Sequence, residues 1–456
     1  MPGLSLIDGE VCPSAWKGPM VSGLILTWFW LHSWRGLLVY FSNDDIMNLY
    51  WARETPFWRL VLSALAPFTT VYRPTGAVLY RCLYALFGLR PFPFRIVCYA
   101  LLLTNLALLY KVTLAITGRR AAGALAAFLA SFHSRFSDLY LNNGTIYDVL
   151  CGSFYFGAIL YYISIRSHGR ALNGRQVAIL YLLATAALNA KEMAATLPVV
   201  LLFYELLRGS RPIASLVAPL CVVALVMGTG AWARFRDASR LMHNDLYALH
   251  LSLGLPNTAA YLNDVFYRKA GALDEIAAPL LIVCLFAIAA LARSGTLLFW
   301  ALFILITPLP VLFIPHRTLY AFYVPVFGWA AFAATLLVRL SHWARFPLPA
   351  LALFITALLL VKHVPIPWSG AMPEGGKLYA LHNDLLAGAP SLPRGSHVLF
   401  LNDAFQGEPW TPLMLLRLTY NDLSLELLRP RGLTQPDRLT ATAVFDYVHG
   451  HMIRTR

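Results

Sequence analysis

The sequence predicts an all-α polytopic membrane protein followed by a small α/β domain. Of its 456 residues 59% are hydrophobic and only 13% are charged, with a mean hydropathy of +0.62, whereas about a quarter of the residues in soluble domains are charged. Long apolar windows recur up to about residue 364, and the composition then becomes mixed. We therefore expect a membrane domain at residues 1–365, with an outer loop at 42–94, and a small soluble domain at 366–456.

The membrane domain contains about eleven apolar windows, each a candidate span because about 20 apolar residues cross a bilayer. The windows are residues 20–41, 95–117, 120–133, 148–165, 176–190, 193–207, 213–233, 276–292, 296–314, 318–339 and 346–364. The first window is too long for the core of a cleavable signal and is not followed by a small-residue cleavage site. We expect it to remain as an anchor.

Basic residues predict the orientation of these windows. The net charge is +14, but the arginines form short clusters between apolar windows and not one stripe, so we expect no nucleic-acid partner. If the windows alternate, most clusters fall on one side, which the positive-inside rule makes the cytoplasm. The clusters are Arg119, Arg120, Arg166, Arg170, Arg175, Arg208, Arg211, Arg293, Arg339 and Arg345. Residues 42–94 and the tail then face outwards. We expect a bacterial inner membrane, in which both would lie in the periplasm.

The outer loop at residues 42–94 is amphipathic. Trp51, Phe57 and Trp58 alternate with polar residues at helical spacing, and five prolines divide the loop, which predicts short helices lying in the membrane interface. Six arginines, five in this loop and one directly after it, break the charge rule here and predict an anionic partner. They are Arg53, Arg59, Arg73, Arg81, Arg90 and Arg95.

Two adjacent carboxylates, Asp44 and Asp45, follow the first window. Neighbouring residues do not point the same way, so they are not expected to act as a geometric pair. One is a candidate general base where a membrane-bound donor meets a water-side acceptor. The other is expected to cap a helix that begins near Ile46, and capping alone is the alternative for both.

Further charged residues lie at the predicted membrane surface. Proline after Tyr72-Arg73 favours an extended Arg73, whose guanidinium suits a phosphate, although an arginine snorkelling to the interface has the same pattern. Lys191-Glu192 interrupts an apolar stretch, as a functional pair or as a hairpin turn. Asp148 is a second acid or a helix cap.

A proline-rich approach leads to His316-Arg317, with Tyr320 after it. Prolines leave backbone groups unpaired, which is tolerated where a segment lines a polar cavity. Arg317 is therefore a candidate ligand for a lipid phosphate. His316 ranks below it, because a lone histidine is more often structural.

These residues resemble the GT-C integral-membrane glycosyltransferases, and in particular the membrane half of the TPR-containing protein O-mannosyltransferases. The resemblance covers residues 20 to 340. Its motifs are Asp44-Asp45, Tyr72-Arg73-Pro74, residues 190–198 (AKEMAATLP), Tyr204-Glu205-Leu206, and Arg317-Thr318-Leu319-Tyr320 with Pro325 and Gly328. His316 stands where that family has glutamate, and the short tail stands in place of the TPR repeats.

The resemblance implies transfer of a sugar from a polyprenyl-phosphate carrier to an acceptor hydroxyl on the outer face, with inversion. It implies Asp44 as the base, with Asp45 as its alternate. It also implies that a set of basic residues binds the donor phosphate and that further residues support this set. The basic set is Arg73, Arg317, Lys191 and His316, and the supporting residues are Tyr72, Glu192, Asp148 and Tyr320.

The six cysteines show no metal-ligand spacing, so no metal and no cofactor are expected. The alternatives are a transporter or lipid flippase and a non-catalytic subunit of a cell-envelope assembly. Transporters usually carry internal repeats and ionisable residues at mid-membrane depth, whereas here the ionisable residues gather on one face, which favours an enzyme.

In the tail, residues 397–401 predict a strand, 402–403 a turn and 411–420 a helix.

Overall fold

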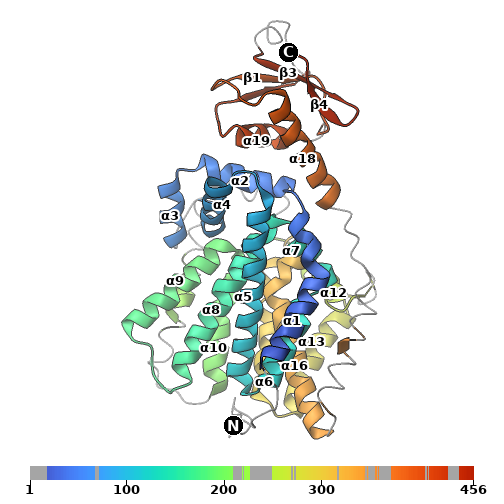
Figure 1. Cartoon of the computed structure of the whole chain (residues 1–456). Coiled ribbons are helices and arrows are strands. Elements are labelled where there is room, and N and C mark those ends of the chain that lie inside the picture. The colour runs from blue at the N-terminus through green and yellow to red at the C-terminus, as the bar shows by residue number, and fades with distance from the viewer. Residues whose placement is uncertain are drawn as a thin grey trace.

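The structure is a computed structural model of the chain. It describes residues 18–66, 71–208, 249–268, 274–315, 318–344, 371–405, 410–429 and 441–456, with short stretches between them. Three parts follow one another in space: a helical bundle, a layer of short helices at one of its ends, and a small α/β domain on that layer (Figure 1).

The bundle is built from apolar helices. They are α1 (Gly18–Ser33), α5 (Pro91–Thr117), α6 (Arg120–Ser131), α8 (Ile146–Arg166), α9 (Gly174–Ala190), α10 (Leu197–Arg208), α12 (Gly254–Val265), α13 (Ala277–Leu291), α14 (Gly295–Ile306), α15 (Leu309–Leu312) and α16 (Tyr323–Trp343). Short connections complete it: η1 (Trp34–Leu38), η2 (Ser134–Phe136), α7 (Ser137–Leu141), η3 (Asn143–Thr145), η4 (Glu192–Thr196), η7 (Leu251–Leu253) and η8 (Leu319–Phe322).

Four helical segments of the described chain are long and apolar enough to cross a membrane: Pro91–Thr117, Asn143–Arg166, Gly295–Leu312 and Leu319–Trp343. Shorter apolar helices cover 120–131 and 277–291. The windows predicted at 213–233 and 346–364 lie mostly outside the described residues. The count of eleven spans and their orientation in a membrane therefore stay predictions.

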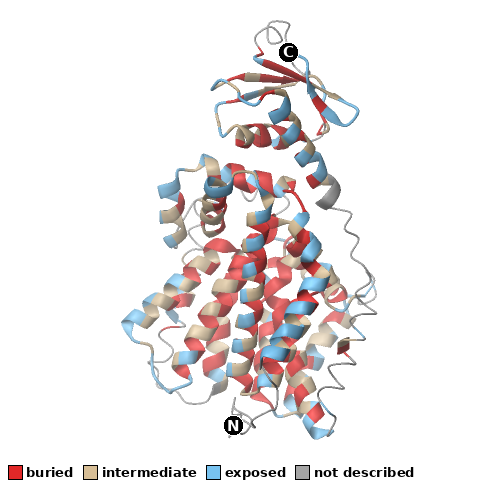
Figure 2. Ribbon diagram, in the orientation of Figure 1, coloured by how far each residue is buried: buried red, intermediate tan, exposed pale blue. Residues whose placement is uncertain are grey.

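The core of the bundle is aromatic, and buried residues follow its centre (Figure 2). Phe156 of α8 contacts both Phe303 of α14 and Phe327 of α16 there. A Cβ on Gly328 would come 2.6 Å from the ring of Phe303. Glycine at this position therefore allows α16 to pack closely on α14.

The layer at the end of the bundle consists of α2 (Asn43–Glu54), α3 (Phe57–Leu65) and α4 (Pro74–Phe87). Proline is the N-cap of α3 and the first residue of α4, positions where its missing N–H costs little. Trp51, Phe57 and Trp58 are exposed, as expected for helices that place aromatic rings in a membrane interface. The prediction of short helices in this loop is confirmed.

The tail forms a four-stranded sheet in the order β2-β1-β3-β4, from β1 (His397–Phe400), β2 (Glu426–Leu428), β3 (Ala443–Val448) and β4 (His451–Arg454). β1 pairs in parallel with β2 and β3, while β3 and β4 are antiparallel. Two helices, α18 (Ala371–Gly388) and α19 (Trp410–Thr419), lie between the sheet and the short helices (Figure 1). The strand and helix predicted here are confirmed; β2 to β4 and α18 were not predicted.

The tail is fixed to the layer by polar contacts. Arg417 donates to the Tyr50 hydroxyl over 2.6 Å, and Tyr84 donates to the Leu418 carbonyl over 2.6 Å. The Asn43 amide donates to Glu408 over 2.7 Å. The small domain therefore lies at the end of the bundle that carries Asp44 and Asp45.

Candidate active site

The acidic pair opens α2, and the structure separates its two members. The helix begins at Asn43, three residues before the predicted start, with Ser42 as the N-cap. Asp45 completes a capping box, because its carboxylate accepts from the Ser42 N–H over 2.9 Å and the Ser42 hydroxyl accepts from the Asp45 N–H. The capping role predicted for one aspartate thus belongs to Asp45, as the third helical residue and not as the N-cap.

Asp45 is fully buried and held on a second side by Tyr80, which donates to it over 3.1 Å. Burial raises the pKa of the Asp45 carboxyl, and the nearby Arg95 and these hydrogen bonds oppose that rise. A carboxylate enclosed in this way has no path to a substrate hydroxyl. The geometry therefore leaves Asp44 as the aspartate of the pair that solvent can reach.

Asp44 is exposed and lies against η3. A Cβ on Gly144 would come 2.9 Å from Asp44 Cβ, so the glycine permits this close approach. Asn142 fixes the two segments together by accepting from the Ser42 hydroxyl over 2.9 Å and from Gly144 N–H over 2.7 Å. Asp148 follows Gly144 by four residues, a rise of about 6 Å along a helix.

Asp138 and Thr318 lie on the same side as Asp44. The Thr318 hydroxyl donates to Asp138 over 3.3 Å. Burial raises the pKa of Asp138, the hydrogen bond from Thr318 lowers it, and the charge of Asp44 raises it again. Thr318 directly follows His316-Arg317, which lie outside the described residues, so their predicted roles rest on the sequence.

Arg73 adopts a left-handed conformation, with φ 43° and ψ 58°, so the predicted extended conformation is wrong. Its contacts explain the difference. The guanidinium donates to both oxygens of Glu192, over 2.9 and 3.1 Å, and lies 4.6 Å from the ring centre of Tyr72 and 5.6 Å from that of Tyr147. These interactions offset the cost of a left-handed backbone before proline.

Lys191 and Asp148 form a second, buried ion pair with an Nζ to Oδ2 distance of 3.1 Å. Lys191 Nζ also lies 5.8 Å from the ring centre of Tyr320. Lys191 ends α9, so the turn expected at Lys191-Glu192 is present, and both of its residues also have charged partners. Asp148 is a partner of lysine and does not cap α8, whose N-cap is Thr145.

The structure thus brings together Tyr72, Arg73, Asp148, Lys191, Glu192 and Tyr320, six of the ten predicted site residues. Two cations and two carboxylates balance in this group, so its formal net charge is zero. The predicted phosphate ligands Arg73 and Lys191 are therefore already paired. A phosphate bound here requires a further cation or rearrangement of these pairs.

Two tyrosines that were not predicted as site residues connect Asp45 to Arg73. The ring of Tyr147 is tilted against that of Tyr80, with ring centres 5.8 Å apart, and lies edge-on to that of Tyr72 at 6.5 Å. Tyr80 has no motif around it. Tyr147 directly precedes Asp148, which could have identified it.

The Arg73–Glu192 pair predicts a pH dependence of stability. Burial raises the pKa of Glu192, but Arg73 and Lys191 lower it more, so it falls from 4.5 to about 2. A pKa lower in the folded state stabilises the fold above the unfolded pKa, and this stabilisation is lost as pH falls towards the folded value. In acid unfolding, we expect the advantage of the wild type over Glu192→Gln to be constant above about pH 5 and to shrink towards about pH 2. A difference independent of pH would contradict the pairing.

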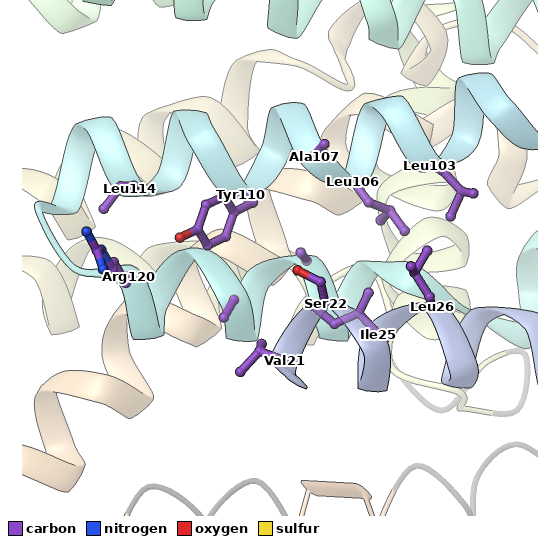
Figure 3. A pocket seen from close by; sticks show the side chains of 12 residues that line it. Val21, Ser22, Ile25, Leu26, Leu103, Leu106, Ala107, Tyr110, Leu114 and Arg120 are labelled. Atoms are coloured by element: carbon purple, nitrogen blue, oxygen red, sulfur yellow. The ribbon is translucent and has the colours of Figure 1, made fainter. Parts of the chain in front are cut away.

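An apolar cavity of the bundle lies elsewhere. It has a volume of about 490 Å³ between α1, α5 and α6, and apolar side chains line it, with Arg120 at one end (Figure 3). No predicted site residue lines this cavity. It is therefore not assigned to the site at Asp44.

Within the described residues, no group of three or more His, Cys, Asp or Glu side chains is placed to hold a metal ion. Metal independence stays a prediction.

Comparison with known proteins gives two findings. Residues 71–232, about a third of the chain, match the family model of dolichyl-phosphate-mannose-protein mannosyltransferases. The fold is similar to that of the Archaeoglobus fulgidus oligosaccharyltransferase, crystallised in complex with zinc and sulfate, with a TM-score of 0.50 and 11% identity over 94% of this chain and 67% of that one. No curated protein matches by sequence.

The matched segment contains Arg73, Asp148, Lys191 and Glu192, and the shared fold extends over nearly the whole chain. Together they support a membrane glycosyltransferase of the GT-C class. Within that class, the matched segment is similar to the mannosyltransferases that act with dolichyl-phosphate mannose.

Proposed function

We propose that this protein transfers a sugar from a polyprenyl-phosphate carrier to a hydroxyl group of an acceptor, with Asp44 as the general base. The observation that carries the proposal is the position of Asp44. It is the exposed member of the acidic pair and lies against Gly144 of η3. Gly144 is four residues before Asp148, and both lie in the segment matched by the mannosyltransferase model.

The proposed reaction is a single displacement. The acceptor oxygen attacks the anomeric carbon of the sugar, and the bond from that carbon to the phosphate oxygen breaks. Asp44 takes the hydroxyl proton, and polyprenyl phosphate leaves with the bonding electron pair. Attack and departure occur on opposite faces of the carbon, so the configuration inverts. A base of ordinary strength suffices when it is well placed.

The leaving phosphate gains negative charge, and fixed cations stabilise it. Because Arg73 is paired with Glu192 and Lys191 with Asp148, we assign the principal contact to Arg317, with His316 beside it. Arg73 and Lys191 line the site with hydrogen-bond donors, and the carboxylates of Glu192 and Asp148 hold these donors in place. The ring of Tyr72 lies beside Arg73, and that of Tyr320 lies beside Lys191.

The acceptor is proposed to approach from the side of the small domain, because α18 and α19 cover the end of the bundle at which α2 lies (Figure 1). In a bacterial inner membrane this side faces the periplasm, as the distribution of arginines predicts.

Turnover tests the proposal. Purified protein in lipid nanodiscs, given a polyprenyl-phosphate sugar and a cell-envelope extract as the source of acceptors, is expected to release free polyprenyl phosphate, with and without a metal chelator. Release that stops with the chelator would contradict metal independence alone. A donor that moves between leaflets without loss of its sugar would contradict the transferase and favour a flippase.

A further inference from the structure

A polar cavity lies between the short helices and the small domain. Its volume is about 480 Å³, and it is separate from the residues around Arg73 and Lys191. Its polar lining comes from α2, α4, α18 and the end of α19, namely Arg53, Arg81, Tyr84, His382, Thr419 and Asn421. Two segments about 330 residues apart in sequence thus build one cavity.

Two arginines face the same cavity without a carboxylate. Arg53 Nε donates to the Asn421 amide oxygen over 2.9 Å, and Arg81 Nη1 donates to the Arg53 carbonyl over 2.8 Å. Within the described part of the chain, neither guanidinium lies within salt-bridge distance of an aspartate or glutamate. Each has five N–H donors, so most of its donors are left for a ligand.

Like charges placed side by side repel each other. Burial and the charge of Arg53 both lower the pKa of Arg81. Part of the arrangement has a structural purpose, since Arg81 caps the carbonyl at the end of α2 and Arg53 suits the negative end of that helix. Each role concerns one arginine by itself, and neither explains why two positive charges lie side by side at the cavity. An oxyanion bound between them would relieve their repulsion.

We infer that this cavity binds a ligand bearing a phosphate or similar oxyanion between Arg53 and Arg81. Arginine forks match such groups with paired hydrogen bonds. Tyr84 and Asn421 provide further polar surface, although the Tyr84 hydroxyl already donates to Leu418. The cavity joins the short helices to the small domain, so a bound anion would stabilise their contact.

The site is distinct from the proposed catalytic base. Arg53 follows Asp44 by nine residues on α2, a separation of about 14 Å along the helix. A small anion therefore binds at Arg53 and Arg81 without touching Asp44. The source of the oxyanion is either a free solute or the headgroup of an anionic phospholipid, and the two are separated by experiment.

The experiment measures thermal unfolding of the full chain in detergent. Sodium phosphate is titrated against sodium chloride at equal ionic strength, and phosphatidylglycerol against phosphatidylcholine. The variants are Arg81→Gln and, as an independent removal of charge, Arg53→Gln. Arg59→Gln is the matched control, because Arg59 is exposed on α3 in the same loop and does not line the cavity.

We expect phosphate or phosphatidylglycerol to stabilise the wild type and Arg59→Gln, and binding to weaken about tenfold or more in Arg81→Gln and Arg53→Gln. A response to phosphate identifies a soluble ligand, and a response to phosphatidylglycerol alone identifies a lipid. The inference is overturned if neither stabilises the wild type beyond its control, or if the cavity variants respond like Arg59→Gln. Asp44→Asn must keep the response, whatever its turnover; loss of the response there would place the anion at the transferase site and overturn the inference as well.

Discussion

Asp44→Asn is expected to lower turnover about 10²- to 10⁴-fold, the usual contribution of a positioned general base. The amide has nearly the shape of the carboxylate but cannot take the proton of the acceptor. Asp44 is exposed, and the capping contacts of α2 belong to Ser42 and Asp45, so the fold is expected to be unchanged. Release of polyprenyl phosphate and the unfolding temperature, measured on the same preparation, check both statements.

Asp45→Asn is the matched control, since it makes the same change one residue away. The amide oxygen of the variant can still accept from the Ser42 N–H, and its NH2 group can donate to the Tyr80 hydroxyl oxygen, so turnover is expected to stay within about tenfold of the wild type. If Asp45→Asn lost turnover while Asp44→Asn kept it, the assignment of the base would be reversed. Equal activity in both would favour a docking role for the acidic pair.

Glu205→Ala is expected to destabilise the protein by about 3–5 kcal/mol, because it leaves the charge of Arg166 buried without its partner. Both side chains are almost completely buried, and two hydrogen bonds of 2.6 and 3.0 Å join them. Tyr162 donates to the same carboxylate over 2.8 Å. Denaturant unfolding in detergent measures the loss.

Glu426→Ala is the control for this change. Glu426 lies 3.7 Å from His397 with both side chains well exposed, and exposed pairs contribute about 0–1 kcal/mol. A second variant, Arg166→Met with Glu205→Leu, removes both charges and is expected to regain most of the stability lost in Glu205→Ala. If the double variant were as unstable as the single one, the cost would not come from an unpaired charge. The contacts of Glu205 thus give the motif Tyr204-Glu205-Leu206 a structural role.

The sequence predicted the parts of this protein that follow from periodicity and composition. Apolar windows located α5, α8 and α16 within a few residues, and prolines divided the outer loop into the helices that the structure contains. The gathering of Arg73, Lys191 and Glu192 followed from a family resemblance, since these residues are distant in sequence. Nothing in local spacing places Arg73 beside Glu192, which is 119 positions away.

Other features depend on tertiary contacts and could not be predicted. Proline after Arg73 favours an extended backbone, yet the contacts with Glu192, Tyr72 and Tyr147 select the left-handed one. The sequence predicted that the two aspartates differ in role but not which one is buried, and that depends on Tyr80, which reaches Asp45 from another helix. The cavity of Arg53 and Arg81 requires the small domain to lie on α2, and no pattern in the tail predicts that contact.

The central claim is that this chain holds a polyprenyl-phosphate sugar, and native mass spectrometry of protein purified in mild detergent tests it most directly. The wild type is compared with Arg317→Ala, and Arg59→Gln again serves as the control for lost charge. We predict a bound polyprenyl phosphate or its sugar adduct in the wild type and in Arg59→Gln, and its loss in Arg317→Ala. Only bulk phospholipid in all three proteins would contradict the assignment of the donor.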